Sequence, residues 1–226
     1  RVLATAKHYL GDGGTEDGID QGDNIASEVE LRDIHAQGYF TALGAGVQTV
    51  MATFNSWKGE KVHGHYYLIT EVLKEQMGFD GLVVSDWNGF KQVERADQLS
   101  CKNCINAGVD MIIAPEDWKP LIGVTLAQVA RGEIEESRIN DAVRRILRVK
   151  FRAGLFAGGR PSERLESASR SVVGSAAHRE IARDAVRQSL VLLKNENRLH
   201  PLSPRQKVRV AGAGADNITQ QCGGWT

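Results

Sequence analysis

Four short apolar runs alternate with amphipathic segments in the first half of the chain. The runs cover residues 2–9, 48–55, 81–87 and 109–114 and are rich in β-branched and other apolar side chains. Each run is followed by a segment in which apolar residues recur every three or four positions, as they do on one face of a helix. A repeated order of strand and helix predicts a parallel α/β fold.

The segments between the runs carry helix signals of their own. Ser27 and Glu30 have the spacing of a capping box, which predicts that a helix begins there. Three further helices, each followed by a glycine in the position that favours it, are expected over residues 66–77, 91–107 and 118–131. A fifth, strongly amphipathic helix is expected to begin at Ser137, with arginines toward its C-terminal half.

The composition changes after residue 156. Residues 157–174 are rich in glycine, arginine and serine and contain a proline, which is typical of a linker. A helix is expected over residues 176–191 and a strand over residues 207–211. We therefore expect one domain over residues 1–156, the linker, and the start of a second α/β domain over residues 175–226.

The number of strand-helix units suggests a barrel. Four such units are half of the eight that close a (β/α)8 barrel, and half a barrel leaves two strand edges that need cover. The first domain is therefore predicted to be the C-terminal half of a TIM-type barrel, in an internal fragment whose missing half precedes Arg1. An open flavodoxin-like sheet is the alternative, because it also repeats strand and helix and binds ligands at strand ends.

Composition and charge exclude several classes of function. The chain has 226 residues, of which 42% are hydrophobic, and its 28 basic side chains balance 28 acidic ones. No basic patch interleaved with aromatics favours nucleic acid, and no apolar run is long enough to span a bilayer. The expected partner is a small neutral molecule. Nothing in the pattern indicates an oligomeric state.

No metal or cofactor is expected from the sequence. Cys101 and Cys104 have a spacing found in zinc sites, but no second pair or matching histidines accompany them. The loop at residues 11–15 lacks the Gly-Lys-Ser/Thr ending of a phosphate-binding loop. The glycines of residues 212–216 lack the third glycine of a dinucleotide fingerprint.

The third apolar run ends in an acid and an indole. Asp86 follows a strand predicted to be buried on both faces, where barrel enzymes place catalytic groups, so it is the candidate nucleophile. An aspartate after a strand also commonly caps the next helix, and this alternative stays open. Lys7 and His8 end the first run and are expected at the same level, where Lys7 would lower the pKa of Asp86. Trp87 and Trp225 present flat apolar faces suited to stacking on a sugar.

Five motifs in order carry a family resemblance. They are residues 6–14 (AKHYLGDGG), 84–87 (VSDW), 144–151 (RRILRVKF), 189–195 (SLVLLKN) and 221–226 (QCGGWT). Together they resemble glycoside hydrolase family 3, and most of all its β-glucosidases and exo-β-glucanases.

The resemblance implies a retaining, exo-acting β-glycosidase built from a (β/α)8-type barrel followed by an α/β sandwich. By position, Asp86 matches the nucleophile, and Lys7 and His8 match residues that hold hydroxyls of the terminal glucose. Trp87 and Trp225 match two indoles that clamp the next sugar. A β-glucoside or β-glucan oligosaccharide is the implied substrate, and a periplasmic or secreted location is implied by relatives.

Three departures and two alternatives accompany this resemblance. The family's acid/base glutamate would fall beyond Thr226, further sugar-binding positions would precede Arg1, and Phe54 stands where many relatives have tyrosine. A fragment without its acid/base would only bind carbohydrate. The family's N-acetylglucosaminidases take their acid/base from a histidine in the loop after the first strand, and residues 11–23 contain none.

Overall fold

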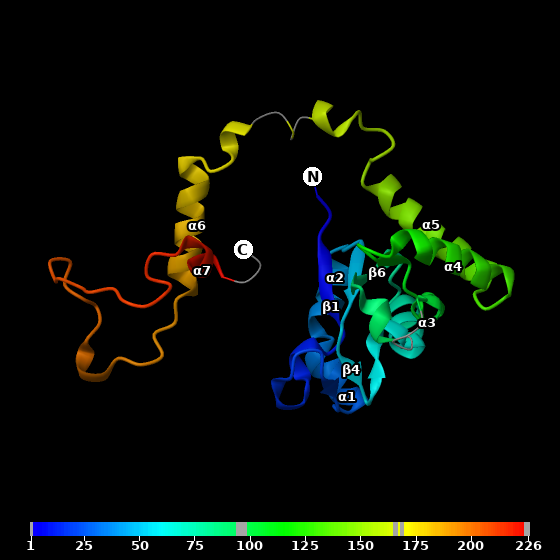
Figure 1. The fold of residues 1–226 in the computed structure, drawn as a ribbon, viewed down its shortest axis with the longest axis horizontal. Coiled ribbons are helices and arrows are strands. Elements are labelled where there is room, and N and C mark those ends of the chain that lie inside the picture. Colours follow the sequence, from blue (N-terminus) through cyan, green and yellow to red (C-terminus); the bar gives the residue numbers. More distant parts are fainter. Residues whose placement is uncertain (1, 94–98, 165–166, 168–169, 224–226) are drawn as a thin grey trace. The chain divides into compact units, whose positions relative to one another are not determined.

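The computed structural model describes residues 2–93, 99–164, 167 and 170–223. The chain divides into two compact units, Arg1–Ala168 and Ser169–Thr226. Figure 1 draws both units, and each is described here by itself.

The first unit is built on a four-stranded parallel sheet. Its strands are β1 (Thr5–Tyr9), β3 (Thr49–Ala52), β6 (Leu82–Trp87) and β7 (Met111–Ile113), hydrogen-bonded in the order β1-β3-β6-β7. Every neighbouring pair is parallel, which places the carboxyl ends of all four strands at one edge. The predicted parallel α/β fold is confirmed.

The two faces of the sheet differ in cover. On β3, Val50 and Ala52 are fully buried, whereas Met51 between them is only partly buried. Met51 pairs with Val84 on β6, and Asp86 lies two residues further along the same face. The carboxylate of Asp86 therefore belongs to the less covered face, at the carboxyl end of its strand.

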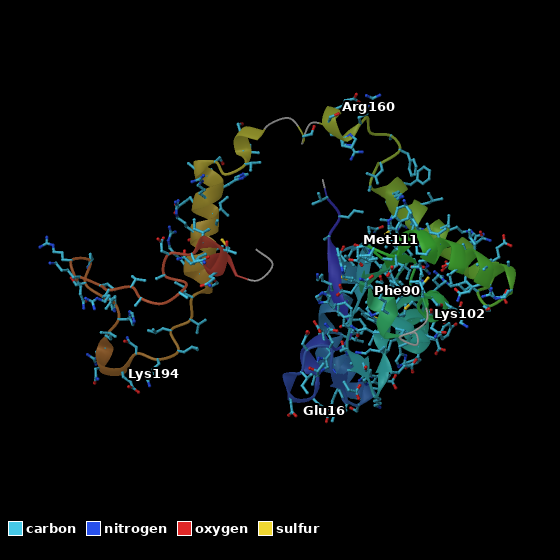
Figure 2. All side chains as sticks on the ribbon, viewed as in Figure 1. Glu16, Phe90, Lys102, Met111, Arg160 and Lys194 are labelled. Atoms are coloured by element: carbon cyan, nitrogen blue, oxygen red, sulfur yellow. The ribbon has the colours of Figure 1, made fainter. Side chains whose placement is uncertain are left out.

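Helical segments cover the other face. They are α1 (Glu28–Glu30), η3 (Leu31–His35), α2 (Gln37–Gly44), η5 (Tyr67–Gln76), α3 (Lys102–Ala107), α4 (Trp118–Ala130) and α5 (Glu136–Arg152). Ser27 and Glu30 form the predicted capping box. Val50 and Val83 of the sheet share one apolar core with Leu68, Ile69 and Leu73 of η5. Figure 2 shows the side chains of this unit gathered around the sheet.

Two helices depart from the expected form. Segments η3 and η5 have π-type hydrogen bonds, as in the bond from the Met77 N–H to the Val72 carbonyl.

The prediction of a helix over residues 91–107 is wrong at the start of that helix. A short turn, η6 (Gly89–Gln92), ends early, and α3 begins only at Lys102. The buried Ser100 hydroxyl accepts from the Lys102 N–H and competes with the helical bonds. Residues 94–98 lie outside the described ranges.

Helix α5 is bound to the amino end of the sheet. Arg145 Nη1 donates to the carbonyls of Phe79 and Gly81, 2.8 and 3.0 Å away, just before β6 begins. Asp110 immediately precedes β7, and its side chain is fully buried and pairs with Lys74 and Arg138. These contacts fix the helices to the edge opposite Asp86.

A small second sheet follows the carboxyl ends of β1 and β3. It joins β2 (Asp23–Asn24), β4 (Ser56–Trp57) and β5 (Glu60–Lys61) in the order β2-β4-β5. The β4–β5 turn contains Lys58 and Gly59, both with positive φ, which suits a tight hairpin. The Asp23 carboxylate accepts from the Gly59 N–H at 2.9 Å. The loops above the main sheet are thus held by strand pairing.

Short 3-10 turns complete the first unit. They are η1 (Asp12–Gly14), η2 (Glu16–Gly18), η4 (Val62–Gly64), η6 and η7 (Pro161–Glu163). Turns η1 and η4 belong to the loops that follow β1 and β5, and both contribute to the site described below.

The second unit contains η9 (Arg170–Val172), α6 (Ala176–Ser189), η10 (Glu196–Arg198) and α7 (Ile218–Cys222). Helix α6 begins at Ser175, whose hydroxyl accepts from the His178 N–H. The strand expected over residues 207–211 is not formed. A strand needs a hydrogen-bonded neighbour, and no described segment of this unit pairs with these residues.

Candidate active site

Asp86 lies near the carboxyl end of β6 with 17% of its side chain exposed. Its Oδ1 accepts from the Trp87 N–H at 2.6 Å, which orients the carboxylate back along its own backbone. The next turn, η6, has Asn88 as its N-cap residue and no side-chain cap. Asp86 is therefore not the cap of the following helical turn, and its second oxygen is left for other partners.

His8 contacts Asp86 from a different strand. Its Nε2 is 3.5 Å from Asp86 Oδ2, and its Nδ1 is 3.3 Å from Asp12 Oδ2. Strand β3 separates β1 from β6, so this contact spans two strand spacings. Side chains on the same face of a flat sheet would start about 10 Å apart at that separation. The contact requires two side chains that lean toward each other across the strand between them.

Among the described residues, the side chains of the other predicted site residues make no ion pair or hydrogen bond with the Asp86 carboxylate. Lys7 is exposed, and in the described part of the chain the ion-pair partner of Asp86 is His8 and not Lys7. Lys7 was expected to act directly on Asp86, but no described ion pair joins the Lys7 ammonium to that carboxylate. Trp87 is 59% exposed, so its indole has a free surface for stacking. Trp225 lies outside the described residues.

Two buried asparagines hold the loop that carries Asp12. Asn24 Nδ2 donates to the Gly11 carbonyl at 2.9 Å, and Asn55 Nδ2 donates to the Leu10 carbonyl at 3.3 Å. Gly11 has a φ of 93°, in the left-handed region that glycine adopts without strain. A side chain on Gly14 would collide with the His35 ring, since a Cβ there would be 2.3 Å from its Cε1. The loop is therefore fixed by hydrogen bonds from the two asparagines and by two glycines that a larger residue could not replace without strain or collision.

A buried histidine from another loop contacts the main chain of Asp86. His63 lies in η4 and is 1% exposed, and its Nε2 accepts a hydrogen bond from the Asp86 N–H at 2.9 Å. Burial lowers the pKa of His63 to about 4, against the smaller opposing effects of the Asp86 charge and of the Thr53 backbone. The ring is therefore neutral at physiological pH.

Lys61 connects two of the loops above the sheet. Its ammonium donates to the carbonyls of Gln21 and Phe54, each 2.9 Å away. Desolvation lowers the pKa of this ammonium, although a nearby carboxylate on Asp23 opposes the shift. Gln21 also accepts from Gln92 Nε2 at 2.6 Å, so the loops after β1, β3 and β6 are joined.

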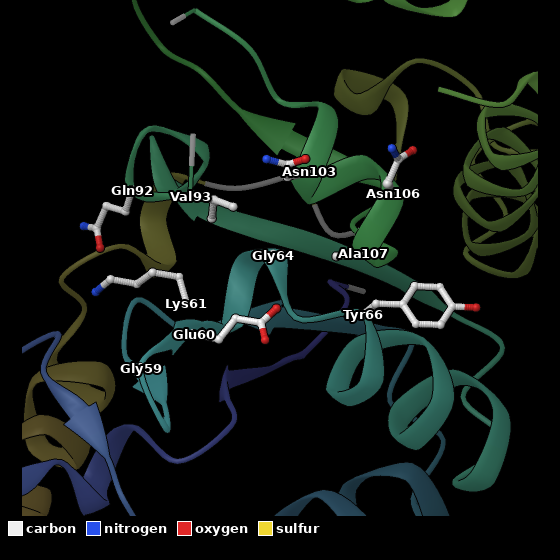
Figure 3. Close-up of a pocket in the computed structure, with 10 residues that line it drawn as sticks. All are labelled: Gly59, Glu60, Lys61, Gly64, Tyr66, Gln92, Val93, Asn103, Asn106 and Ala107. Carbon is white, nitrogen blue, oxygen red and sulfur yellow. The ribbon is translucent and has the colours of Figure 1, made fainter. Parts of the chain in front are cut away.

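A hollow of about 610 Å³ lies beside these loops. Figure 3 shows Lys61 and Gln92 at one end of it, with Asn103 and Asn106 facing Glu60 across it. None of the residues predicted to carry chemistry lines this hollow. The carboxylate of Asp86 instead belongs to the less covered face of the main sheet.

Metal centres and membrane spans are not found in the part of the chain that the structure describes. Within those ranges, no group of three or more His, Cys, Asp or Glu side chains is arranged to hold a metal ion. Among the helices of the same ranges, none combines the length and apolar character that crossing a bilayer requires.

The sequence pointed to some of these residues and missed others. Asp86 and His8 were predicted from strand ends and lie together. His63, Asn24 and Asn55 were not predicted, because each is a polar residue and the sequence alone gives no sign that its side chain is buried. The one available signal for His63 was its position shortly after a strand of the presumed catalytic edge.

The sequence of this chain is similar to a known protein family and to several named enzymes. The family model described as the glycosyl hydrolase family 3 N terminal domain matches residues 1–149. Lysosomal β-glucosidase of Dictyostelium discoideum is 32% identical over all of this chain, which covers 28% of that protein. Periplasmic β-glucosidase of Salmonella typhimurium is 30% identical over all of this chain, which covers 30% of it.

A solved structure is similar over almost the full chain. The exo-1,3/1,4-β-glucanase from a Pseudoalteromonas species is 54% identical, with a TM-score of 0.91 over 99% of this chain and 28% of that protein. The chain therefore spans between 28% and 30% of the length of these relatives.

Proposed function

Because this chain belongs to glycosyl hydrolase family 3, we propose that it is part of a retaining, exo-acting β-glycosidase. The proposed substrates are β-glucosides or β-glucan oligosaccharides, from which the enzyme releases the terminal glucosyl residue. The relatives named above are β-glucosidases and an exo-β-glucanase. The observation that carries the proposal within this chain is the contact between His8 and Asp86 at the carboxyl edge of the sheet.

The proposed fold of the first domain is half of a (β/α)8 barrel. In such barrels, the inward side chains of one layer come from alternate strands. His8 on β1 and Asp86 on β6 are on alternate strands and touch, which supports curvature of this kind. We assign this half barrel to residues 1–156, a linker to residues 157–174, and the start of an α/β sandwich to residues 175–226.

In the proposed reaction, Asp86 is the nucleophile. One carboxylate oxygen attacks the anomeric carbon and forms an ester to the sugar while the bond to the leaving oxygen breaks. A second carboxylic acid, expected in the remainder of the enzyme, gives its proton to that oxygen. It then takes a proton from the water that cleaves the ester and restores the Asp86 carboxylate. The two carboxyl groups should stand about 5 to 5.5 Å apart.

The neighbours of Asp86 have roles that fit this reaction. His8 and Lys7 are proposed to donate hydrogen bonds to hydroxyls of the terminal sugar, because the His8 imidazole already lies against the nucleophile. The exposed indole of Trp87 is proposed to stack on the next sugar, and the same function is proposed for Trp225. A periplasmic or secreted location is proposed for the whole enzyme, in line with the name of the Salmonella relative.

The first test is hydrolysis of a nitrophenyl β-glucoside by the full-length enzyme. Asp86→Asn keeps the shape of the side chain and removes its nucleophilic charge, so we expect kcat to fall by about 10⁴-fold or more. Asp33→Asn is the matched control, because Asp33 is an exposed aspartate paired only with Arg32 in the described structure.

Three results would count against the proposal. They are an unchanged rate in Asp86→Asn, a comparable loss in Asp33→Asn, and an enzyme that hydrolyses the nitrophenyl β-N-acetylglucosaminide but not the β-glucoside. The last result would instead indicate that the enzyme is a β-N-acetylglucosaminidase of the same family.

A further inference from the structure

The residue that fixes the backbone of Asp86 comes from a separate loop. His63 lies in η4, after the β4–β5 hairpin, and its ring is almost completely buried. The hydrogen bond from the Asp86 N–H to His63 Nε2 is 2.9 Å long. It acts on the main chain of Asp86 and involves neither carboxylate oxygen.

The direction of this bond fixes the tautomer of the ring. Since Nε2 accepts, it carries no proton, and the proton of the neutral imidazole is on Nδ1. The backbone of Thr53, which follows β3, partly opposes the lowering of the His63 pKa. The ring thus serves the Asp86 main chain as a hydrogen-bond acceptor.

The ring is also confined by packing. Gly89 faces it closely: a Cβ on Gly89 would be 2.3 Å from His63 Nε2 and 2.6 Å from its Cε1. The Phe54 ring is packed against it as well, with centroids 5.7 Å apart. A glycine after the strand is required at this point, because any larger residue would displace the acceptor.

We propose that His63 is a positioning residue for the nucleophile, holding the Asp86 main chain so that its carboxylate meets the anomeric carbon in line. This inference rests on the proposed function of Asp86. A nucleophile must lie within a few tenths of an ångström of its reacting position, and a misplacement of about 1 Å costs on the order of 100-fold in rate. His63 touches no substrate in this role, so its loss acts on the chemical step more than on binding.

The test uses two substitutions in the full-length enzyme. His63→Gln places an amide oxygen about where Nε2 lies and keeps an acceptor, whereas His63→Met fills similar volume without one. We expect His63→Met to lower kcat for a nitrophenyl β-glucoside by about 10- to 100-fold with KM changed by less than about 3-fold. His63→Gln should recover kcat to within about 5-fold of the native enzyme.

A second pair of variants keeps the inference testable if His63→Met fails to fold. Gly89→Ala places a Cβ against Nε2, the atom that accepts from the Asp86 N–H, and should also lower kcat with little effect on KM. Gly38→Ala is its matched control, because Gly38 is exposed and a Cβ there meets no atom within 4 Å. That variant should keep native kcat.

The outcomes separate the two proposals. If the native enzyme hydrolyses β-glucosides and Asp86→Asn is inactive, but His63→Met and Gly89→Ala keep native kcat, only the role of His63 is overturned. It is also overturned if His63→Gln and His63→Met lose activity equally, since that pattern indicates packing alone. If the native enzyme does not cleave β-glucosides, or Asp86→Asn retains its rate, the proposed function fails first.

Discussion

At the scale of single residues, the burial of His63 links the stability of the first unit to pH. The side chain is neutral in the folded protein because burial lowers its pKa from 6.5 to about 4. In the unfolded chain the same imidazole would take up a proton near pH 6.5. Between these two values the unfolded state binds a proton that the folded state does not, so acidification favours unfolding.

The expected size of this effect is about 3 kcal/mol for full acidification from above pH 6.5 to below pH 4. His63→Gln lacks the titrating group, so the difference in unfolding free energy between the native enzyme and this variant should shift by about 2 to 3 kcal/mol between pH 7.5 and pH 4.5. Denaturant unfolding at both pH values measures it. His178→Gln, at an exposed histidine of α6, is the control. An identical difference at both pH values would show that His63 titrates normally.

The sequence is informative about residues with a chemical signature and silent about residues defined by burial. Asp86 and His8 end apolar runs, and a strand that stops at a polar side chain predicts a site. His63 and Asn24 are polar residues outside the main sheet, and only the folded chain shows that their side chains are buried. Lys7 was expected to act directly on Asp86, but the contact to that carboxylate comes from His8, because the sequence alone does not say which of the two neighbouring side chains turns inward.

At the scale of elements, the amino edge of the sheet depends on a buried ion network. The carboxylate of Asp110 is fully buried, with Oδ1 2.9 Å from Lys74 Nζ and also bound to Arg138, and Oδ2 2.8 Å from the Val83 N–H. Burial lowers the pKa of Lys74 to about 8 despite its pairing with Asp110. The network joins η5, β6, β7 and α5.

Removing the central charge should destabilise the unit. Asp110→Asn removes the buried carboxylate from Lys74 and Arg138, which then share only the more exposed carboxylate of Asp141 among the described residues, and we expect a loss of about 3 to 5 kcal/mol in unfolding free energy. Asp80→Asn is the matched control, since the pair of Asp80 with Arg152 on α5 is exposed and should contribute about 1 kcal/mol or less. Urea unfolding of the full-length enzyme compares them, and equal losses would contradict a structural role for the network.

Element prediction succeeded where a run of apolar side chains marked each strand. All four strands of the main sheet coincide with such runs. The start of α3 was misplaced because the Ser100 side chain satisfies a backbone N–H that periodicity assigns to the helix. The strand expected over residues 207–211 is absent from the second unit, where its apolar residues Val208 and Val210 remain exposed.

At the scale of the whole molecule, the parallel sheet brings one carboxylate and one imidazole together at its carboxyl edge. The parallel order of the strands explains this meeting, because every strand ends on the same side. Family 3 membership connects the pair to glycoside hydrolysis. The relatives are more than three times as long as this chain, and the acid/base partner is proposed to lie in their additional length.

The central claim is that Asp86 forms a covalent bond to the sugar. In a β-glucoside with fluorine in place of its 2-hydroxyl, both the formation and the hydrolysis of the glycosyl ester are slow. A good leaving group speeds only the formation, so the ester on the enzyme accumulates. After treatment of the full-length enzyme and proteolysis, mass spectrometry should find one modified peptide, heavier by a fluoroglucosyl group attached to Asp86. Inactivation with the label on a different carboxylate, and an unmodified Asp86 peptide, would contradict the account.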